Sequence, residues 1–367
     1  MANRIYGEAH VARLFRLLTE QAGARIHGGI PLPGRGNTWQ RWMLLAQVAA
    51  RDVSLVKLFE AHTDALAILA ELGASAPQAG SRWAVWAAEP PDARVALHVD
   101  EHAECGVSLS GRKAWCSGAP LVTHALLTCW NAQGQACLAI LALDAPGIAI
   151  DESAWRSPAM VAARTADLVF DGTPVRSLGE PGAYLDRPGF WHGGAGIAAC
   201  WLGAVVPFVL ALRAQVARRA DPHDAVQLGA ADVALRGAWA MLREAAAWVD
   251  AHPAGDAVHV VRRARLAAET AATQVMAYAS RALGAGPLCH DAALATRFCD
   301  MQVFLRQSHG ERDLAALGTG LAGQAQGRGA DQGWAPWLPL GPDDMQDRQD
   351  DFLTHLFSHD SSHCIGN

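Results

Sequence analysis

The stretch CGVSLSGRKAWCSG, residues 105–118, begins with alternating apolar and polar residues and stands at the centre of a series of similar segments. Its neighbours in the chain are WAVWAA, RVALHV, HALLTCW, ACLAILALD and ADLVFDGTPV, which are short and either apolar or alternating. Turn-forming runs such as Pro-Pro, Asn-Ala-Gln-Gly and Ala-Pro-Gly separate them. Strand and turn signals at this spacing are typical of a β-sandwich or barrel. The sequence therefore predicts a middle β-domain over residues 83–176.

The residues before this domain have helical periodicity. Apolar residues recur at three- and four-residue spacing in His10 to Leu18, Gln40 to Ala50 and Ser54 to Leu72. The loop GGIPLPGRGN separates the first two segments, because its glycines and prolines exclude regular structure. Residues 1–82 are therefore predicted to form an N-terminal helical domain.

The residues after the β-domain are helical again. Four segments of comparable length have helical periodicity or helix-start signals, which is the count of an antiparallel four-helix bundle. They span about residues 195–213, 221–249, 261–283 and 292–317. The predicted fold class is α+β, with a C-terminal four-helix bundle over residues 177–317. The rest, residues 318–367, is expected to be a poorly ordered or loosely docked tail.

Composition limits the classes of function. Charged residues are only 18% of the chain and the net charge is −6, so we expect no nucleic-acid partner. The 25 residues from Pro188 to Leu212 lack a formal charge, but glycines and Pro207 dilute the run, which we interpret as a buried core helix and not a membrane span. No secretory signal is visible, which favours a cytoplasmic location. No cysteine pair has C-x-x-C spacing, and no metal site is predicted.

Specific residues add a resemblance to a known family. The segment LSGRKAWCSG, residues 109–118, resembles the strand L-x-G-x-K-x-W-I-T-N-G of the acyl-CoA dehydrogenase family. The segment WAAEPP, residues 86–91, resembles the family's T-E-P turn, and Arg297 with Asp300 is similar to its R-x-x-R-D helix start. The resemblance covers about residues 40–317 and implies the fold described above together with an FAD cofactor.

The resemblance also implies cofactor contacts. Trp115 would flank the flavin ring, while Cys116 and Ser117 would present backbone and hydroxyl groups to its polar edge. Such donors lower the cost of the negative charge on a reduced flavin. Arg218 lies in RRADP, which matches the R-x-x-F-G-x-P motif that helps to hold the cofactor's pyrophosphate, but the Phe-Gly pair is missing.

The usual catalytic glutamates of that family have no counterpart in this chain. The Y-E-G-T turn is replaced by QSHGE, which puts Ser308 or His309 where the glutamate would be. A second subgroup has its glutamate in the first bundle helix, and the matching positions here are Gly193 and Gly194. We therefore expect the residues that contact the flavin to be kept, while the catalytic glutamate is replaced.

Three functions follow from these matches. The first is α,β-dehydrogenation of an acyl thioester or related substrate, with electrons passed to a partner. Its base would be His309, whose imidazole has an ordinary pKa of about 6.5, with Glu311 second and His192 nearby. The second is flavin-dependent monooxygenation with an external flavin reductase, in which His309, Ser117 and His192 would serve. The third is a catalytically inactive flavin- or acyl-binding protein. The family resemblance also implies a homodimer or homotetramer.

Overall fold

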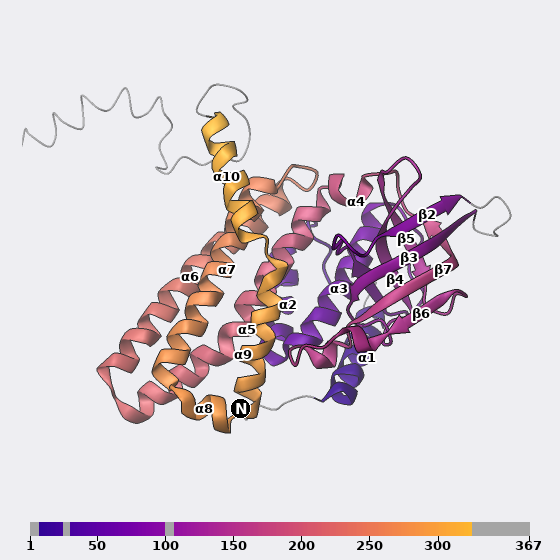
Figure 1. Ribbon diagram of the computed structural model, residues 1–367. Helices are drawn as coiled ribbons and strands as arrows, with labels where there is room; N and C mark the ends of the chain where they lie inside the picture. Colours follow the sequence, from indigo (N-terminus) through magenta and orange to yellow (C-terminus); the bar gives the residue numbers. More distant parts are fainter. Residues whose placement is uncertain (1–6, 25–29, 100–105, 325–367) are drawn as a thin grey trace, which may run out of the picture. The chain divides into compact units, whose positions relative to one another are not determined.

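The computed structural model describes residues 7–24, 30–99 and 106–324 of the chain (Figure 1). Three helices come first: α1 (Glu8–Ala24), α2 (Thr38–Arg51) and α3 (Val53–Glu71). Asp52 alone separates α2 from α3, and its extended backbone lets its carboxylate accept a hydrogen bond from Leu55 N as the cap of α3. The predicted N-terminal helices are confirmed.

A sheet follows, as the segments around residues 105–118 predict. Its strands are β1 (Trp83–Trp86), β2 (Val95–Val99), β3 (Val107–Cys116), β4 (His124–Trp130), β5 (Ala136–Ala142), β6 (Ile148–Asp151) and β7 (Ala166–Ser177), with the short helices η1 (Glu152–Ala154) and η2 (Val161–Ala163) before β7. Pairing runs from β4 through β2, β3, β7 and β5 back to β4, while β1 extends β4 and β6 extends β7. The sheet therefore closes on itself as a barrel.

Strand β4 shows why its sequence is apolar on both faces. Leu126 packs with Ile68 and Leu69 of α3, whereas its neighbour Leu127 belongs to the main hydrophobic core. Because successive strand residues point to opposite faces, both faces of β4 are covered by other elements. Helix α3 thus packs directly on the sheet.

The C-terminal region is helical, as predicted, but its divisions differ in detail. It contains α4 (Ala183–Asp186), α5 (Gly189–Arg219), α6 (Pro222–Ala251), α7 (Val258–Leu283), α8 (Ala285–His290), α9 (Ala292–Phe304), η3 (Leu305–Gln307) and α10 (Gly310–Gln324). The expected single helix over 292–317 is wrong: Ser308 has an extended backbone, and a new helix begins at Gly310. The buried apolar stripe of α9 ends at Leu305, so no core contact holds the next residues in one straight helix.

Helix α10 also changes the start of the predicted tail. Residues 318–324 continue this helix, so the expected loose segment does not begin at residue 318. Residues 325–367, the remainder of that predicted tail, lie outside the described residues. Contacts group residues 1–321 into one unit and residues 322–367 into another, and only 322–324 of the second are described.

Helix α5 is the uncharged segment that imitates a membrane span in the sequence. By length and composition it passes as a candidate span, yet 67% of its most apolar window is buried within the protein. It packs against α2, α6 and α7. A Cβ atom on Gly203 would lie within van der Waals overlap of the Ala46 backbone, so glycine is what lets α5 and α2 approach. This burial fits the expected core helix.

A single side chain from α9 ties α2 to α5. The guanidinium group of Arg297 donates hydrogen bonds to the carbonyl oxygens of Ala49, Ala50 and Arg51 at the end of α2, and to that of Ala204 in α5. The last carbonyls of a helix have no partner within the helix. Arg297 therefore serves as a side-chain cap from a distant part of the chain.

Candidate functional site

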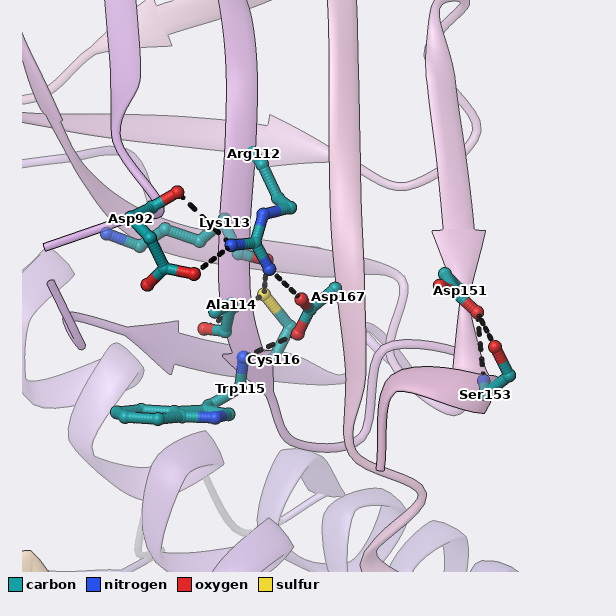
Figure 2. A network of polar contacts seen from close by, with 9 residues as sticks. All are labelled: Asp92, Arg112, Lys113, Ala114, Trp115, Cys116, Asp151, Ser153 and Asp167. Atoms are coloured by element: carbon teal, nitrogen blue, oxygen red, sulfur yellow. Dashed lines mark hydrogen bonds and ion pairs between the residues drawn. The ribbon is translucent and has the colours of Figure 1, made fainter. Parts of the chain in front are cut away.

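The end of β3 holds Trp115 in an unusual backbone conformation. Its φ is +59°, and its side chain is 57% exposed although indole rings usually lie mostly buried. Lys113 pairs with Leu168 of β7 and Cys116 pairs with Ala166, so β3 has one residue more than its partner between these two pairs. This is a β-bulge, and it turns the ring of Trp115 away from the strand (Figure 2).

Hydroxyl groups lie directly after the bulge. Ser117 Oγ and Thr165 Oγ1 are 3.1 Å apart, and Trp86 Nε1 donates to the backbone oxygen of Ser117 at 3.1 Å. Gly118 N donates to Ala163 O, which joins this turn to η2. We call Trp115, Ser117 and Thr165 the Trp115 ledge. Its flat ring beside two hydroxyl groups suits a planar ligand with a polar edge.

Two further residues with positive φ flank η2 next to the ledge. Met160 has a φ of +55° and Arg164 a φ of +45°. Asp300 of α9 accepts a hydrogen bond from Met160 N at 2.6 Å, so the bundle holds this loop against the sheet. Burial raises the pKa of Asp300 to about 6, opposed by that hydrogen bond. Left-handed non-glycine residues in ordered loops cluster where the surroundings impose a geometry, as at ligand sites.

The side chains of Lys113 and Cys116, on either side of Trp115 in the sequence, both lie in the interior of the protein. Lys113 is fully buried, and its ammonium group donates to Glu89 Oε1 at 2.5 Å and to Thr128 O and Oγ1 at 2.8 Å. The Cys116 thiol is also buried, and burial raises its pKa. The structure therefore leaves only the backbone of Cys116 for contact with a ligand at the ledge.

A group of charged side chains lies where α2, α3, α5 and α7 meet. We call Arg41, Glu60, Asp64 and Arg265 the bundle charge cluster. Glu60 is only 7% exposed, and Lys57 Nζ lies 3.8 Å from its carboxylate, with the charges of Arg41 and Arg265 acting on it as well. Asp64 accepts no hydrogen bond from another described residue. These carboxylates thus have the spare acceptor capacity that a bound polar group needs.

Glycines of α5 make the room for this cluster. A Cβ on Gly193 would lie 2.6 Å from Asp64 Oδ1, and one on Gly194 would lie 3.5 Å from a terminal nitrogen of Arg265. Arg265 donates a hydrogen bond to Gly194 O and lies 5.1 Å from the ring centroid of Trp201. A carboxylate from α3 therefore occupies the space that a side chain at Gly193 would fill, whereas a Cβ at Gly194 would only make ordinary contact with Arg265.

Protonation of Glu60 changes near neutral pH. Burial raises the pKa of Glu60 to about 7, Asp64 adds to this, and Lys57, Arg41 and Arg265 oppose it. A carboxyl group with such a pKa can give or take a proton at physiological pH. Its position beside Asp64 makes Glu60 the best acid–base candidate in the described part of the chain.

The predicted base positions at the start of α10 lie close to a third carboxylate. Ser308 Oγ donates to Glu269 Oε2 of α7 at 2.5 Å, and a Cβ on Gly310 would come within 2.7 Å of that oxygen. His309 and Glu311 are exposed at the first turn of α10. The structure therefore brings Ser308 to Glu269 and leaves His309 and Glu311 facing solvent.

His192 and Arg218 are placed separately from these groups. His192 is 3% exposed, its Nε2 has no hydrogen-bond partner among the described residues, and burial lowers its pKa. A Cβ on Gly34 would be 3.7 Å from its ring, so His192 faces the loop before α2. Arg218 is exposed at the end of α5 and makes no ion pair with another described residue.

Arg218 lines a cavity of about 1010 Å³. Its walls come from η2 next to the ledge (Val161, Ala162), from the start of α3 (Asp52–Ser54), from the second half of α5, and from α9. This volume is at the upper end of the range for ligand pockets. A cation that pairs with no described carboxylate, at the wall of such a cavity, is suited to bind a phosphate group.

Sequence reasoning missed Glu60, Asp64 and Glu269, and also Asp167 of β7, whose carboxylate accepts a hydrogen bond from Trp115 N. For the first two a signal was present: Lys57, Glu60 and Asp64 recur at three- and four-residue spacing, as one charged stripe on the otherwise apolar helix α3. Glu269 and Asp167 have no such signal, because their roles depend on contacts with residues distant in sequence.

No protein-family model and no curated protein matches the chain. Solved structures do match it. One is KijD3 in complex with FMN and dTDP-3-amino-2,3,6-trideoxy-4-keto-3-methyl-D-glucose, at 22% identity and a TM-score of 0.71, covering 88% of each chain. Another is the TdsC of Paenibacillus sp. A11-2 with FMN and indole, at 16% identity and a TM-score of 0.69, covering 86% of this chain and 96% of that one.

The butyryl-CoA dehydrogenase of Megasphaera elsdenii also matches, at 17% identity and a TM-score of 0.71, covering 87% of this chain and 91% of that one. The acyl-CoA dehydrogenase fold predicted from residues 109–118 and their context is thereby confirmed. At these identities the likeness concerns the fold, and chemistry has to be argued from the residues.

Proposed function

We propose that the chain is a flavin-dependent oxidoreductase that binds its flavin on the Trp115 ledge. The observation that carries the proposal is the exposed Trp115 ring, set in a left-handed bulge beside two hydroxyl groups, in a fold that holds FMN in KijD3 and TdsC. A flavin ring would cover the indole, and Ser117 and Thr165 would supply hydrogen bonds to its polar edge. When bound, the flavin supplies the two-electron redox chemistry that amino-acid side chains lack.

Arg218 is proposed as the phosphate partner of the flavin nucleotide. Both FMN and FAD contain a phosphate, so this residue fits either one. The sequence resemblance implies FAD, while two of the compared structures hold FMN. Titration with each nucleotide separately decides between them.

The reaction we favour is monooxygenation of a small organic substrate. In such a reaction one atom of O₂ enters the substrate, the other leaves as water, and two electrons come from reduced flavin supplied by a separate reductase. Support comes from the turn before α10, where Ser308 stands at the position of the family's acidic base and its hydroxyl donates to Glu269. A structure of the same fold, TdsC, is described as a dibenzothiophene monooxygenase.

Dehydrogenation of an acyl thioester is the second candidate, and the bundle charge cluster favours it. Removal of a proton next to a thioester carbonyl needs a base. The pKa of Glu60, about 7, lets its carboxylate accept a proton near neutral pH. In that case the base has moved from the family's usual positions to α3. Glu60 and Asp64 then take the role proposed from sequence for His309, Glu311 and His192.

An oligomer is also proposed. Leu210 of α5 and Val226 and Val233 of α6 are 55%, 65% and 73% exposed, which leaves apolar surface for a second copy. A homodimer or homotetramer would cover it. Light scattering of the purified protein measures the assembly directly.

Visible spectroscopy of the purified protein tests the proposed function. Wild-type protein and Trp115→Ala are titrated with FMN and with FAD, and wild type alone is expected to bind with micromolar or tighter affinity. Monooxygenation predicts oxygen consumption with a flavin reductase and substrate, whereas dehydrogenation predicts anaerobic bleaching by an acyl thioester. Failure of wild type to bind either nucleotide removes both reactions and leaves the inactive binding protein.

A further inference from the structure

The bulge at Trp115 leaves a backbone N–H without a partner in the β-ladder, and one carboxylate takes it. Asp167 lies on β7 between Ala166 and Leu168, directly across from the bulge. Its Oδ1 accepts a hydrogen bond from Trp115 N at 3.2 Å (Figure 2). Asp167 is 8% exposed, so few waters compete for this bond.

A second contact fixes the carboxylate itself. Asp167 Oδ2 accepts from Arg112 at 2.5 Å, and the other terminal nitrogen of Arg112 donates to Asp92 Oδ2 at 2.6 Å and to Asp92 O at 3.1 Å. Arg112 is thus held from two sides, with Asp167 on the buried side and Asp92 on the exposed side. These charge-assisted bonds leave Asp167 little freedom to rotate.

The conformation that this network holds is costly for tryptophan. A left-handed backbone is unfavourable for a non-glycine residue, because its Cβ atom comes too close to the following carbonyl oxygen. Among the described strands, Trp115 is the non-glycine residue that adopts it. Released from Asp167, the backbone would gain by returning to an extended conformation, which would carry the indole to another position.

We propose that Asp167 is the positioning residue of the Trp115 ledge, with Arg112 holding Asp167 in place. The hydrogen bond to Trp115 N fixes the left-handed backbone, and the backbone fixes where the ring lies. Flavin affinity then depends on a carboxylate that does not itself belong to the ledge. The effect on flavin affinity rests on the proposed function, whereas the effect of Asp167 on the position of the Trp115 ring does not.

The chain provides a matched control on the neighbouring strand. Asp151 of β6 pairs with Asp167 in the β6–β7 ladder. Its carboxylate accepts from Ser153 N at 2.9 Å and Ser153 Oγ at 2.6 Å, and so faces a different turn (Figure 2). Asp151→Ala removes a carboxylate from the same sheet without touching the bulge.

The experiment uses ¹⁹F NMR of the full chain labelled with 5-fluorotryptophan. The Trp115 resonance is assigned by its loss in Trp115→Phe. Asp167→Ala is expected to shift or split that resonance, Arg112→Gln to do so to a smaller extent, and Asp151→Ala to leave it in place. Because Arg112 is partly exposed, Arg112→Gln remains informative should Asp167→Ala fold poorly.

Flavin titration of the same variants gives the second readout. Asp167→Ala is expected to bind flavin about tenfold more weakly, the equivalent of one lost hydrogen bond to a charged group. An unchanged Trp115 resonance in both Asp167→Ala and Arg112→Gln overturns the inference. If wild type binds no flavin, the proposed function fails, whereas the NMR result still decides the role of Asp167.

Discussion

The Trp115 ledge and the bundle charge cluster are built in opposite ways. At the ledge, Trp115 N, Ser117 Oγ and the Arg112 guanidinium all have hydrogen-bond partners. In the charge cluster, Asp64 accepts no hydrogen bond from a described residue, and the Glu60 carboxylate has Lys57 Nζ at 3.8 Å. The ledge is therefore a rigid binding surface. The cluster is a group of charges that can exchange a proton or bind a ligand.

The two lysines of the chain allow the sharpest test of this difference, because one lies in each region. Lys113 beneath the ledge is fully buried with three hydrogen bonds, and Lys57 lies 3.8 Å from Glu60 at the cluster. Lys113→Ala is expected to lower the free energy of unfolding by about 3 kcal/mol, since it leaves Glu89 and Thr128 without their partner. Lys57→Ala should cost less than about 1 kcal/mol.

Urea unfolding of both variants at pH 7 measures these costs. Equal losses for the two lysines would show that the ledge is no more rigidly built than the cluster. Removal of Lys57 should also raise the pKa of Glu60 further, because Lys57 is a cation that opposes its protonation.

The second prediction concerns pH. The pKa of Glu60 rises on folding from 4.5 to about 7, so between these values the folded state binds more protons than the unfolded state. The contribution of Glu60 to stability is therefore complete below pH 4.5 and is lost as pH rises towards 7, by roughly 1.4 kcal/mol per unit. Glu60→Gln, which stays neutral, should show a smaller loss between pH 5 and 7.

Chemical denaturation across that pH range provides the measurement. Glu311→Gln is the control, because Glu311 is exposed on α10 and should leave the pH dependence as in wild type. A Glu60→Gln profile that runs parallel to wild type would contradict a neutral Glu60 at pH 5.

The third prediction, with the smallest expected effect on stability, concerns the addition of one methyl group to α5. Gly193→Ala places its Cβ 2.6 Å from Asp64 Oδ1, and Gly194→Ala places its Cβ at an ordinary contact distance of 3.5 Å from Arg265. Asp64 can swing away, so stability should change by less than about 1 kcal/mol. If the reaction is the dehydrogenation in which the bundle charge cluster takes part, displacement of this carboxylate should nevertheless lower turnover about tenfold, whereas Gly194→Ala should keep it.

Steady-state kinetics on the substrate found in the flavin assays compares the two alanine variants. Similar turnover in both would remove Asp64 from the reaction, while leaving the ledge and its flavin untouched.

Local sequence signals were enough for most of the fold. The helices before residue 72 and the strands after residue 83 repeat apolar residues with the period of their own structure, and packing agrees with that pattern. The break between α9 and α10 was missed because Arg306 to Asp313 is polar and compatible with helix throughout. Its position depends on where the core stops, at Leu305, and on the contact between Ser308 and Glu269.

The candidate site could be predicted only in part for a similar reason. Trp115 stands in a recognisable segment, so its strand was predictable, but its left-handed backbone depends on Asp167, 52 residues later. Glu60 and Asp64 have meaning only once glycines of α5 lie opposite them. A residue whose role depends on a contact with another helix or strand cannot be recognised from the local pattern of a single sequence.

Arg297 has a consequence for the order in which the chain folds. The carbonyl groups it binds at the end of α2 are up to 248 residues earlier in the chain. During synthesis α2 emerges long before α9, so its last turn remains uncapped until almost all of the described chain has left the ribosome. Contacts of such high sequence separation form late, because a long loop must close first. The N-terminal helices are therefore expected to reach protease resistance only after α9 has emerged from the ribosome.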